Sequence, residues 1–128
     1  MLRTIPDIHA LVTPLLGTPY AEMDCWDLVR LLFKQGFGLD LARDTERAAT
    51  AFQEVWYRGD TDPLPLVQPW DLVIIANHDA LPVSDHVGVV VDTQQFVHAR
   101  LSETGVALGR LRTWKPRLLQ LARYRELV

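Results

Sequence analysis

Residues 86–99 read HVGVVVDTQQFVHA, two runs of β-branched and aromatic residues around one polar turn. Valine and phenylalanine favour pleated strands, and Asp92-Thr93-Gln94 fits the turn between them. The stretch therefore predicts a β-hairpin with His86 at the head of the first strand and His98 in the second. An odd-length turn would put both imidazoles on one face, whereas a two-residue turn needs a bulge to do so. The sequence leaves this register open.

Further strand patterns lie on both sides of the hairpin. The β-branched and aromatic content of the second half predicts strands over Trp70–Ala76, Val106–Arg112 and Ala122–Leu127. Residues 60–69 read as a loop, because three prolines in seven residues exclude a ladder or a helix.

Helical spacing of apolar residues dominates the first half. Residues 5–16 predict a short helix whose last turn is distorted by Pro14. A stronger helix is expected to start at Asp24, with Asp27 completing a capping box, and to end at Gly36 and Gly38.

A third helix is expected from Asp44 or Thr45 to Gly59, on the shared spacing of its apolar residues Ala48, Phe52, Val55 and Trp56. Helices then occupy the first half and strands the second. This order predicts an α+β fold in which N-terminal helices pack on a C-terminal antiparallel sheet, as one domain over residues 1–128.

Length and composition exclude several classes of protein. The chain has 128 residues, 48% hydrophobic and 23% charged, which suits one compact domain rather than a disordered chain. Its longest apolar run, Leu72–Ala76, is far too short to span a bilayer. The N-terminus lacks the pattern of a secretory signal, so synthesis in the cytoplasm without a signal peptide is expected.

Basic residues gather at the end of the chain. Residues 100–128 hold 7 basic and 2 acidic residues, whereas residues 1–99 hold 6 and 14. No aromatic platform accompanies the arginines, so we interpret them as a solvated face and expect no nucleic acid. Trp56 and Trp114 have no motif partner and are expected in the core or an interface.

The lone cysteine, Cys25, lies in the first turn of the expected second helix, where backbone N–H groups favour a thiolate. His86 is the best candidate base for it, and His98 can fix the tautomer of His86. The alternatives are a small core cysteine and two structural histidines. One cysteine forms no internal disulfide and no zinc pattern, so no metal or cofactor is expected. His9 and His78 lack such a setting and are interpreted as surface residues.

These residues belong to a series of motifs that spans residues 17–99. In order and spacing the series resembles the NlpC-type cell-wall peptidases, which are papain-like cysteine hydrolases. The bulky residue after the cysteine and the following Leu-Val-Arg are similar to phage-tail members of that family. The motifs are Gly17-Thr18-Pro19-Tyr20, Asp24-Cys25-Trp26-Asp27-Leu28-Val29-Arg30, Asp71-Leu72-Val73, His86-Val87-Gly88-Val89 and Phe96-Val97-His98-Ala99.

The resemblance implies a papain-like fold and the hydrolysis of an amide bond in peptidoglycan stem peptides. Cys25 then matches the nucleophile, His86 the base and His98 the third, polar member. Asp24 matches the residue that meets the free amine of the stem peptide, and Tyr20 the one that shapes the site. The enzyme would act at the cell wall after delivery by a phage tail or secretion machinery.

The sequence departs from the family pattern at two tryptophans. Trp26, with Asp27, replaces the small Ser-Gly pair beside the nucleophile and either lines or fills the substrate cleft. Trp70 replaces the glycine of the usual Pro-Gly-Asp and is expected to pack against the sheet. Two alternatives stay open, a non-catalytic tail or interaction protein that retains the fold, and a related cysteine acyltransferase or amidase with another substrate.

Overall fold

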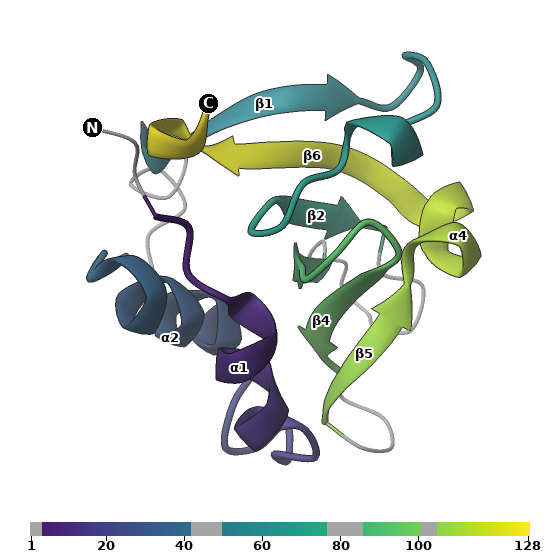
Figure 1. Cartoon of the computed structure of the whole chain (residues 1–128). Coiled ribbons are helices and arrows are strands. Elements are labelled where there is room, and N and C mark those ends of the chain that lie inside the picture. Colours follow the sequence, from purple (N-terminus) through teal and green to yellow (C-terminus); the bar gives the residue numbers. More distant parts are fainter. Residues whose placement is uncertain (1–3, 42–49, 77–85, 101–104) are drawn as a thin grey trace.

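The computed structural model describes residues 4–41, 50–76, 86–100 and 105–128. Six strands form one antiparallel sheet in the order β1-β6-β2-β3-β4-β5, and α1 and α2 lie against one side of it (Figure 1). This arrangement confirms the predicted α+β fold. The helices and strands are α1 (Ile8–Val12), α2 (Cys25–Phe37), β1 (Phe52–Tyr57), β2 (Leu72–Ile75), β3 (His86–Val90), β4 (Gln95–Ala99), β5 (Val106–Arg110), α4 (Leu111–Trp114) and β6 (Leu118–Tyr124).

Helix α2 forms where its sequence pattern predicts. Asp24 caps its N-terminus in a reciprocal capping box with Asp27, and Gly38 ends it in the left-handed conformation at φ 66°. The four apolar residues of its inner face, Leu28, Val29, Leu32 and Phe33, are all buried. The helix thus supplies the apolar face that covers the sheet.

Gly36 does not end the helix, contrary to the prediction. It lies inside α2, and a Cβ there would come within 2.5 Å of the Trp70 ring. Trp70 is fully buried against Phe33 and Phe37, and its indole N–H donates to the Pro6 carbonyl at 2.9 Å. Its φ of 76° is one that glycine adopts readily and tryptophan rarely. Trp70 therefore keeps a glycine-type backbone while it fills the core, which confirms the expected packing role.

Helix α1 is shorter than the predicted span 5–16. Asp7 caps it by accepting from the His9 N–H at 3.1 Å, so the helix begins at Ile8. The chain then continues as a 3₁₀ turn over Thr13–Leu15 that contains Pro14. The proline thus distorts the last turn, as predicted.

The prediction of a third helix is wrong over 52–57, where the chain forms β1; its beginning at Asp44 or Thr45 lies outside the described residues. Phe52 and Trp56 are four residues apart, a spacing that places two side chains on one side of either a helix or a regular strand. In β1 the pairing with β6 shifts between Glu54 and Trp56. Phe52 consequently packs in the α2-side core, whereas Trp56 packs in the cluster on the other face.

The remaining strands differ from prediction mainly at their ends. The fifth strand stops at Arg110 because the chain turns into α4, and β6 begins at Leu118, four residues before the expected Ala122. The expected loop over 60–69 contains a short 3₁₀ turn at Leu64–Leu66. These ends depend on pairing with neighbouring strands, which a single-strand pattern does not contain.

Candidate active site

The capping box fixes the start of α2 and hence the place of the lone cysteine. Asp24 Oδ1 accepts from the backbone N–H of Asp27 at 2.8 Å, and Asp27 Oδ2 accepts from that of Asp24 at 3.3 Å. Cys25 is the first residue of the helix and is half-buried. The thiol therefore lies at the positive end of the helix, as the sequence predicts.

The expected preference for a thiolate is wrong for this environment. Burial raises the pKa of the Cys25 thiol, and the nearby Asp24 carboxylate raises it further. Hydrogen bonds from the backbone N–H groups of Val87, Trp26 and Cys25 itself lower the pKa, but less than burial and Asp24 together raise it. The thiol is accordingly protonated at neutral pH.

The two histidines of the hairpin lie on the same face. Strands β3 and β4 pair Val89 with Val97 and Val90 with Phe96, around a three-residue turn. This odd-length turn gives the equal-parity register that the sequence left open. His86 Nε2 lies 2.8 Å from His98 Nδ1, a hydrogen bond between the two imidazoles.

His98 is held in its neutral form. Its side chain is only 2% exposed, and desolvation lowers its pKa from 6.5 to about 3, with smaller contributions from His86 and Arg100. A neutral imidazole has one N–H and one acceptor nitrogen. At any pH near neutrality His98 can therefore serve as a hydrogen-bond acceptor for a charged His86.

Gly88 makes room for the neighbouring strands of the hairpin. A Cβ there would come within 2.7 Å of the Phe96 ring and 2.8 Å of the Val97 carbonyl oxygen. Both atoms belong to β4, so the close approach is between the two strands of the hairpin. Gly88 thus lets β3 and β4 pack closely beside the two histidines.

Cys25 lies near the start of β3, the strand whose first residue is His86. The Cys25 thiol is hydrogen-bonded to the Val87 backbone, and Val87 directly follows His86 in the chain. The structure thus brings the N-terminus of α2 to the strand end that carries His86, while His86 contacts His98 on β4. The residues predicted as nucleophile, base and third member come from three different elements, and cysteine-based acyl chemistry requires residues of these types close together.

The three residues predicted to bind substrate lie around the start of α2. The Asp24 carboxylate caps the helix next to the thiol. Tyr20 lies in the preceding turn, and both Tyr20 and Trp26 are partly buried against the main core cluster. The Trp26 indole nitrogen is buried and has no hydrogen-bond partner among the residues that the structure describes. All three are near Cys25 in the chain, but each also has a structural role.

Sequence reasoning assigned no role to the groups that enclose His98. Trp114, at the end of α4, contacts the His98 ring edge to face, with centroids 5.1 Å apart. The guanidinium groups of Arg100 and Arg117 lie over the Trp114 ring at 5.3 and 5.2 Å. No motif marks these positions, which meet only through the fold. Trp56 is buried in the core and Trp114 packs partly buried against the same cluster, as expected for both.

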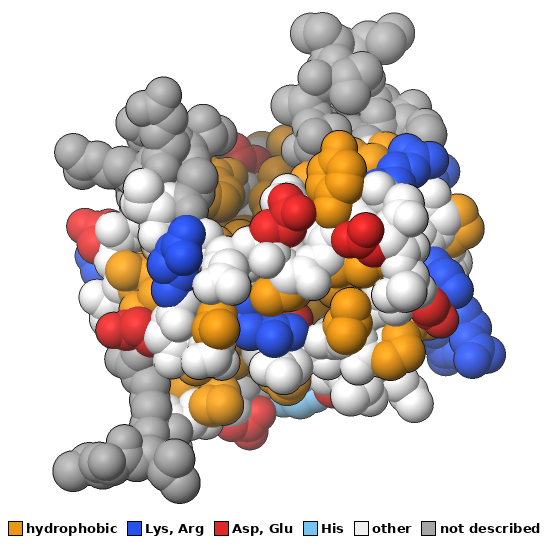
Figure 2. Space-filling model, turned by 90° about the horizontal axis from the view of Figure 1, so that it is seen from above, with side chains coloured by type: hydrophobic (Ala, Val, Ile, Leu, Met, Phe, Trp, Pro, Cys, Tyr) orange, Lys and Arg blue, Asp and Glu red, His pale blue; other side chains and the backbone are white. Residues whose placement is uncertain are grey.

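The expected solvated face of basic residues is only partly correct. Arg123 forms a bidentate ion pair with the fully buried Asp71, at 2.8 and 2.9 Å. Arg125 donates to the Thr50 carbonyl. On the face shown in Figure 2, Lys and Arg side chains are dispersed among acidic and hydrophobic ones. Part of the basic C-terminal segment therefore stabilises the fold.

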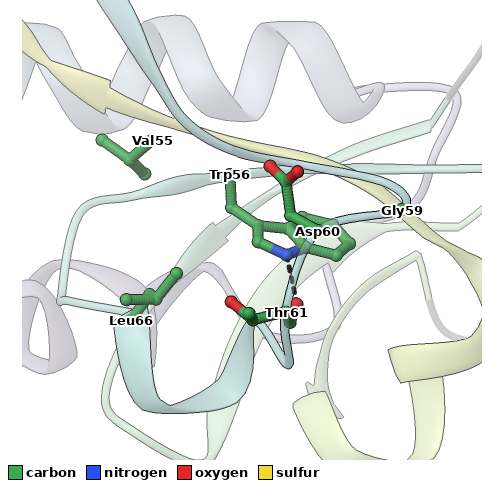
Figure 3. A pocket seen from close by; sticks show the side chains of 6 residues that line it. All are labelled: Val55, Trp56, Gly59, Asp60, Thr61 and Leu66. Atoms are coloured by element: carbon green, nitrogen blue, oxygen red, sulfur yellow. Dashed lines mark hydrogen bonds between the residues drawn. The ribbon is translucent and has the colours of Figure 1, made fainter.

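A separate hollow of about 540 Å³ opens between β1 and the following loop (Figure 3). Trp56 forms part of its wall, and its indole N–H donates to the Thr61 carbonyl. The other lining residues are Val55, Gly59, Asp60, Thr61 and Leu66. None of the predicted site residues lines this hollow, so it is distinct from the cysteine–histidine site.

Metal ligands, membrane helices and surface histidines were also considered in the sequence. Among the described residues, no group of three or more His, Cys, Asp or Glu side chains is placed to hold a metal ion. In the same part of the chain, no helix is long and apolar enough to cross a bilayer. His9 is exposed, 3.3 Å from the Asp92 carboxylate, as expected for a surface residue; His78 lies outside the described residues.

A protein-family model matches most of the chain. Residues 15–123 match the model of the NlpC/P60 family. No protein with a curated description matches the chain. The matched region contains Cys25, His86 and His98.

Several solved structures share the fold at low sequence identity. The chain is similar to a lipoprotein-like NLP/P60 family protein from Staphylococcus aureus, at 22% identity and TM-score 0.65, over 92% of this chain and 40% of that one. NlpC2 from Trichomonas vaginalis has 20% identity and TM-score 0.70, over 97% and 48%. The NlpC/p60 domain of the peptidoglycan hydrolase SagA has 20% identity and TM-score 0.65, over 91% and 95%. The chain thus spans less than half of two of these proteins and nearly all of the SagA domain.

Proposed function

This chain belongs to the NlpC/P60 family, and from that premise we propose that it is a cysteine peptidase that hydrolyses an amide bond in the stem peptides of bacterial peptidoglycan. Two hydrogen bonds carry the proposal. One joins His86 to His98 at 2.8 Å, and the other runs from the Val87 backbone, next to His86 in the chain, to the Cys25 thiol. The similarity to a domain of a protein described as a peptidoglycan hydrolase supports the cell-wall substrate.

The imidazole contact determines the tautomers that catalysis requires. His86 must accept the thiol proton on Nδ1, because its Nε2 is occupied by His98. His86 then carries a proton on Nε2 and donates it to the lone pair on His98 Nδ1. His98 must therefore be neutral with its proton on Nε2, which agrees with its low pKa. In this form His98 orients His86 and stabilises the imidazolium that develops.

The reaction proceeds by general-base activation of a protonated thiol. As the Cys25 proton moves to His86 Nδ1, Sγ attacks the carbonyl carbon of the scissile amide. The C–N bond breaks, His86 returns the proton to the leaving amine, and an acyl-enzyme remains. Water then attacks with His86 as base and regenerates the thiol. Backbone N–H groups of Cys25 and Trp26, which already point at the sulfur, are suited to stabilise the oxyanion.

The residues at the start of α2 would recognise the substrate. The Asp24 carboxylate beside the thiol suits the free amine of a stem peptide, since an ammonium group would also offset its charge. Tyr20 and Trp26 would shape the pocket from the preceding turn and the first helical turn. We assign no cofactor to this reaction.

The place of action is also part of the proposal. The bulky residue after Cys25 and the Leu28-Val29-Arg30 sequence resemble phage-tail peptidases, and we propose that the enzyme reaches the cell wall in a phage tail or phage-like particle. Phage particles induced from the host and probed with antibody should contain the protein. Its presence only in the soluble host fraction would contradict this route.

Hydrolysis of defined stem peptides tests the proposed chemistry. Cys25→Ala and His86→Ala should abolish release of the amine, because they remove the nucleophile and the base. His98→Asn should retain part of the rate, since the amide oxygen can still accept from His86. His9→Ala, at an exposed histidine, is the matched control and should equal wild type. Full activity of Cys25→Ala would contradict the mechanism.

One observation favours a second candidate, a non-catalytic interaction protein with the same fold. Burial raises the pKa of Cys25, so the resting thiol is not a strong nucleophile. Under this hypothesis Trp26 occludes the cleft, wild type is inert on peptidoglycan of several chemotypes, and Trp26→Ala creates activity. Under the catalytic hypothesis wild type is active without any substitution.

A further inference from the structure

His98 sits in a cage of rings that limits how its imidazole can turn. The Phe96 ring is tilted against it at 4.7 Å, and the Trp114 ring meets it edge to face at 5.1 Å and 82°. Gly109 lies beside the same ring, where a Cβ would come within 3.2 Å of His98 Nε2. The orientation of this ring is therefore a property of its packing.

The orientation matters because a neutral histidine has a single acceptor nitrogen. A half-turn of the His98 ring about its Cβ–Cγ bond would replace Nδ1 by a C–H group at the position facing His86. The 2.8 Å contact with His86 Nε2 would then be lost. The hydrogen bond to His86 favours the observed orientation, and the rings packed on His98 oppose its rotation.

Trp114 is the part of this cage that is itself held by charged groups. Arg100 follows β4 and Arg117 lies in the 3₁₀ turn after α4, and both place a guanidinium over the Trp114 ring. Phe96 is fully buried in the second core cluster, whereas Trp114 is only partly buried. Trp114 is thus the more exposed of the two aromatic rings that pack on His98.

We propose that Trp114, held by Arg100 and Arg117, is a positioning residue that keeps His98 Nδ1 on His86 and keeps water away from the His98 ring. The catalytic consequence rests on the proposed function, in which this contact orients the base. Trp114 touches no reacting group in this scheme and acts only through His98.

The charges around His98 agree with this role. His86 faces it from β3, Arg100 from the position after β4, and Arg117 adds a second guanidinium over the Trp114 ring. Desolvation lowers the pKa of His98 to about 3, with smaller contributions from the charges of His86 and Arg100. Removing the indole would admit water to the His98 ring. Desolvation, the largest cause of the low pKa, would then be weaker.

Nitrogen-15 spectra of the histidine side chains test the proposal without any substrate. In wild type His98 should show one tautomer, with its proton on Nε2, and should not titrate above pH 4. In Trp114→Ala it should show a mixture of tautomers and titrate about one pH unit higher or more. Trp56→Phe, a substitution in the same core cluster away from His98, is the matched control and should resemble wild type.

Activity supplies the second readout. Trp114→Ala should lower kcat by about tenfold to a hundredfold with little change in KM, as expected for a misplaced base, and Trp114→Phe should restore most of it. If Trp114→Ala does not fold, Arg117→Ala replaces it, with the same direction of change. Wild-type spectra or wild-type kcat in a folded Trp114→Ala or Arg117→Ala protein would overturn the proposal. If wild type cleaves no stem peptide, the proposed function fails while the spectra still decide the role of Trp114.

Discussion

The buried, neutral His98 predicts a specific dependence of stability on pH. Its pKa is about 3 in the folded protein and about 6.5 in an unfolded chain. As the pH falls below 6.5, the unfolded state binds a proton that the folded state does not, so the free energy of unfolding decreases by up to about 1.4 kcal/mol per pH unit. Between pH 7 and pH 4.5 this single group should cost about 2.5 kcal/mol. The loss continues until the pH reaches the folded-state pKa near 3.

Urea unfolding of wild type and His98→Asn isolates this contribution. Asparagine keeps a hydrogen-bond acceptor but does not titrate, and the other acidic and basic groups are common to both proteins. The four tryptophans provide the fluorescence signal. The free energy of unfolding of wild type should fall about 2.5 kcal/mol further than that of the variant between pH 7 and pH 4.5. Parallel pH profiles of the two proteins would refute the assignment of His98 as a buried neutral acceptor.

Three further substitutions test other parts of the structure. Asp24→Asn should accelerate alkylation of Cys25 by iodoacetamide at pH 8, because it removes a charge that raises the thiol pKa and keeps a capping side chain; an unchanged or slower rate would contradict this. Trp26→Ala should leave the fold intact and change the ratio of kcat/KM between two stem peptides that differ beside the scissile bond, and an unchanged ratio would remove Trp26 from the substrate site. Asp71→Asn should lower the free energy of unfolding in urea by about 3 kcal/mol, because it leaves the largely buried Arg123 guanidinium without its ion-pair partner, and a loss below about 1 kcal/mol would contradict this.

The parts of the fold that were predictable are those decided by neighbouring residues. The capping box at Asp24 and the hairpin around Asp92-Thr93-Gln94 depend on side chains a few positions apart. A short stretch of sequence is therefore enough to predict each of them. Strand β1 was missed because the spacing of Phe52 and Trp56 suits a helix and a strand equally. The choice was made by pairing with β6, about 66 positions further along the chain.

Some features of the candidate site were likewise predictable from local sequence, and others were not. Its three polar residues could be selected from local pattern, and the structure then supplied the register that brings His86 and His98 together. The pKa of Cys25 was predicted with the wrong sign, because the helix N-terminus is visible in sequence but the burial of the thiol is not. Trp114 was missed as a neighbour of His98 for the same reason, since α4 and β4 meet only in the folded chain.

Mass spectrometry of stem-peptide digests in water enriched in heavy oxygen tests the central claim most directly. A cysteine peptidase should produce a new carboxyl terminus that carries one heavy oxygen atom, together with the free amine fragment. The Cys25→Ala protein should produce neither fragment. Fragments that form equally with Cys25→Ala, or an acyl fragment joined to another amine with no heavy oxygen incorporated, would contradict hydrolysis through Cys25.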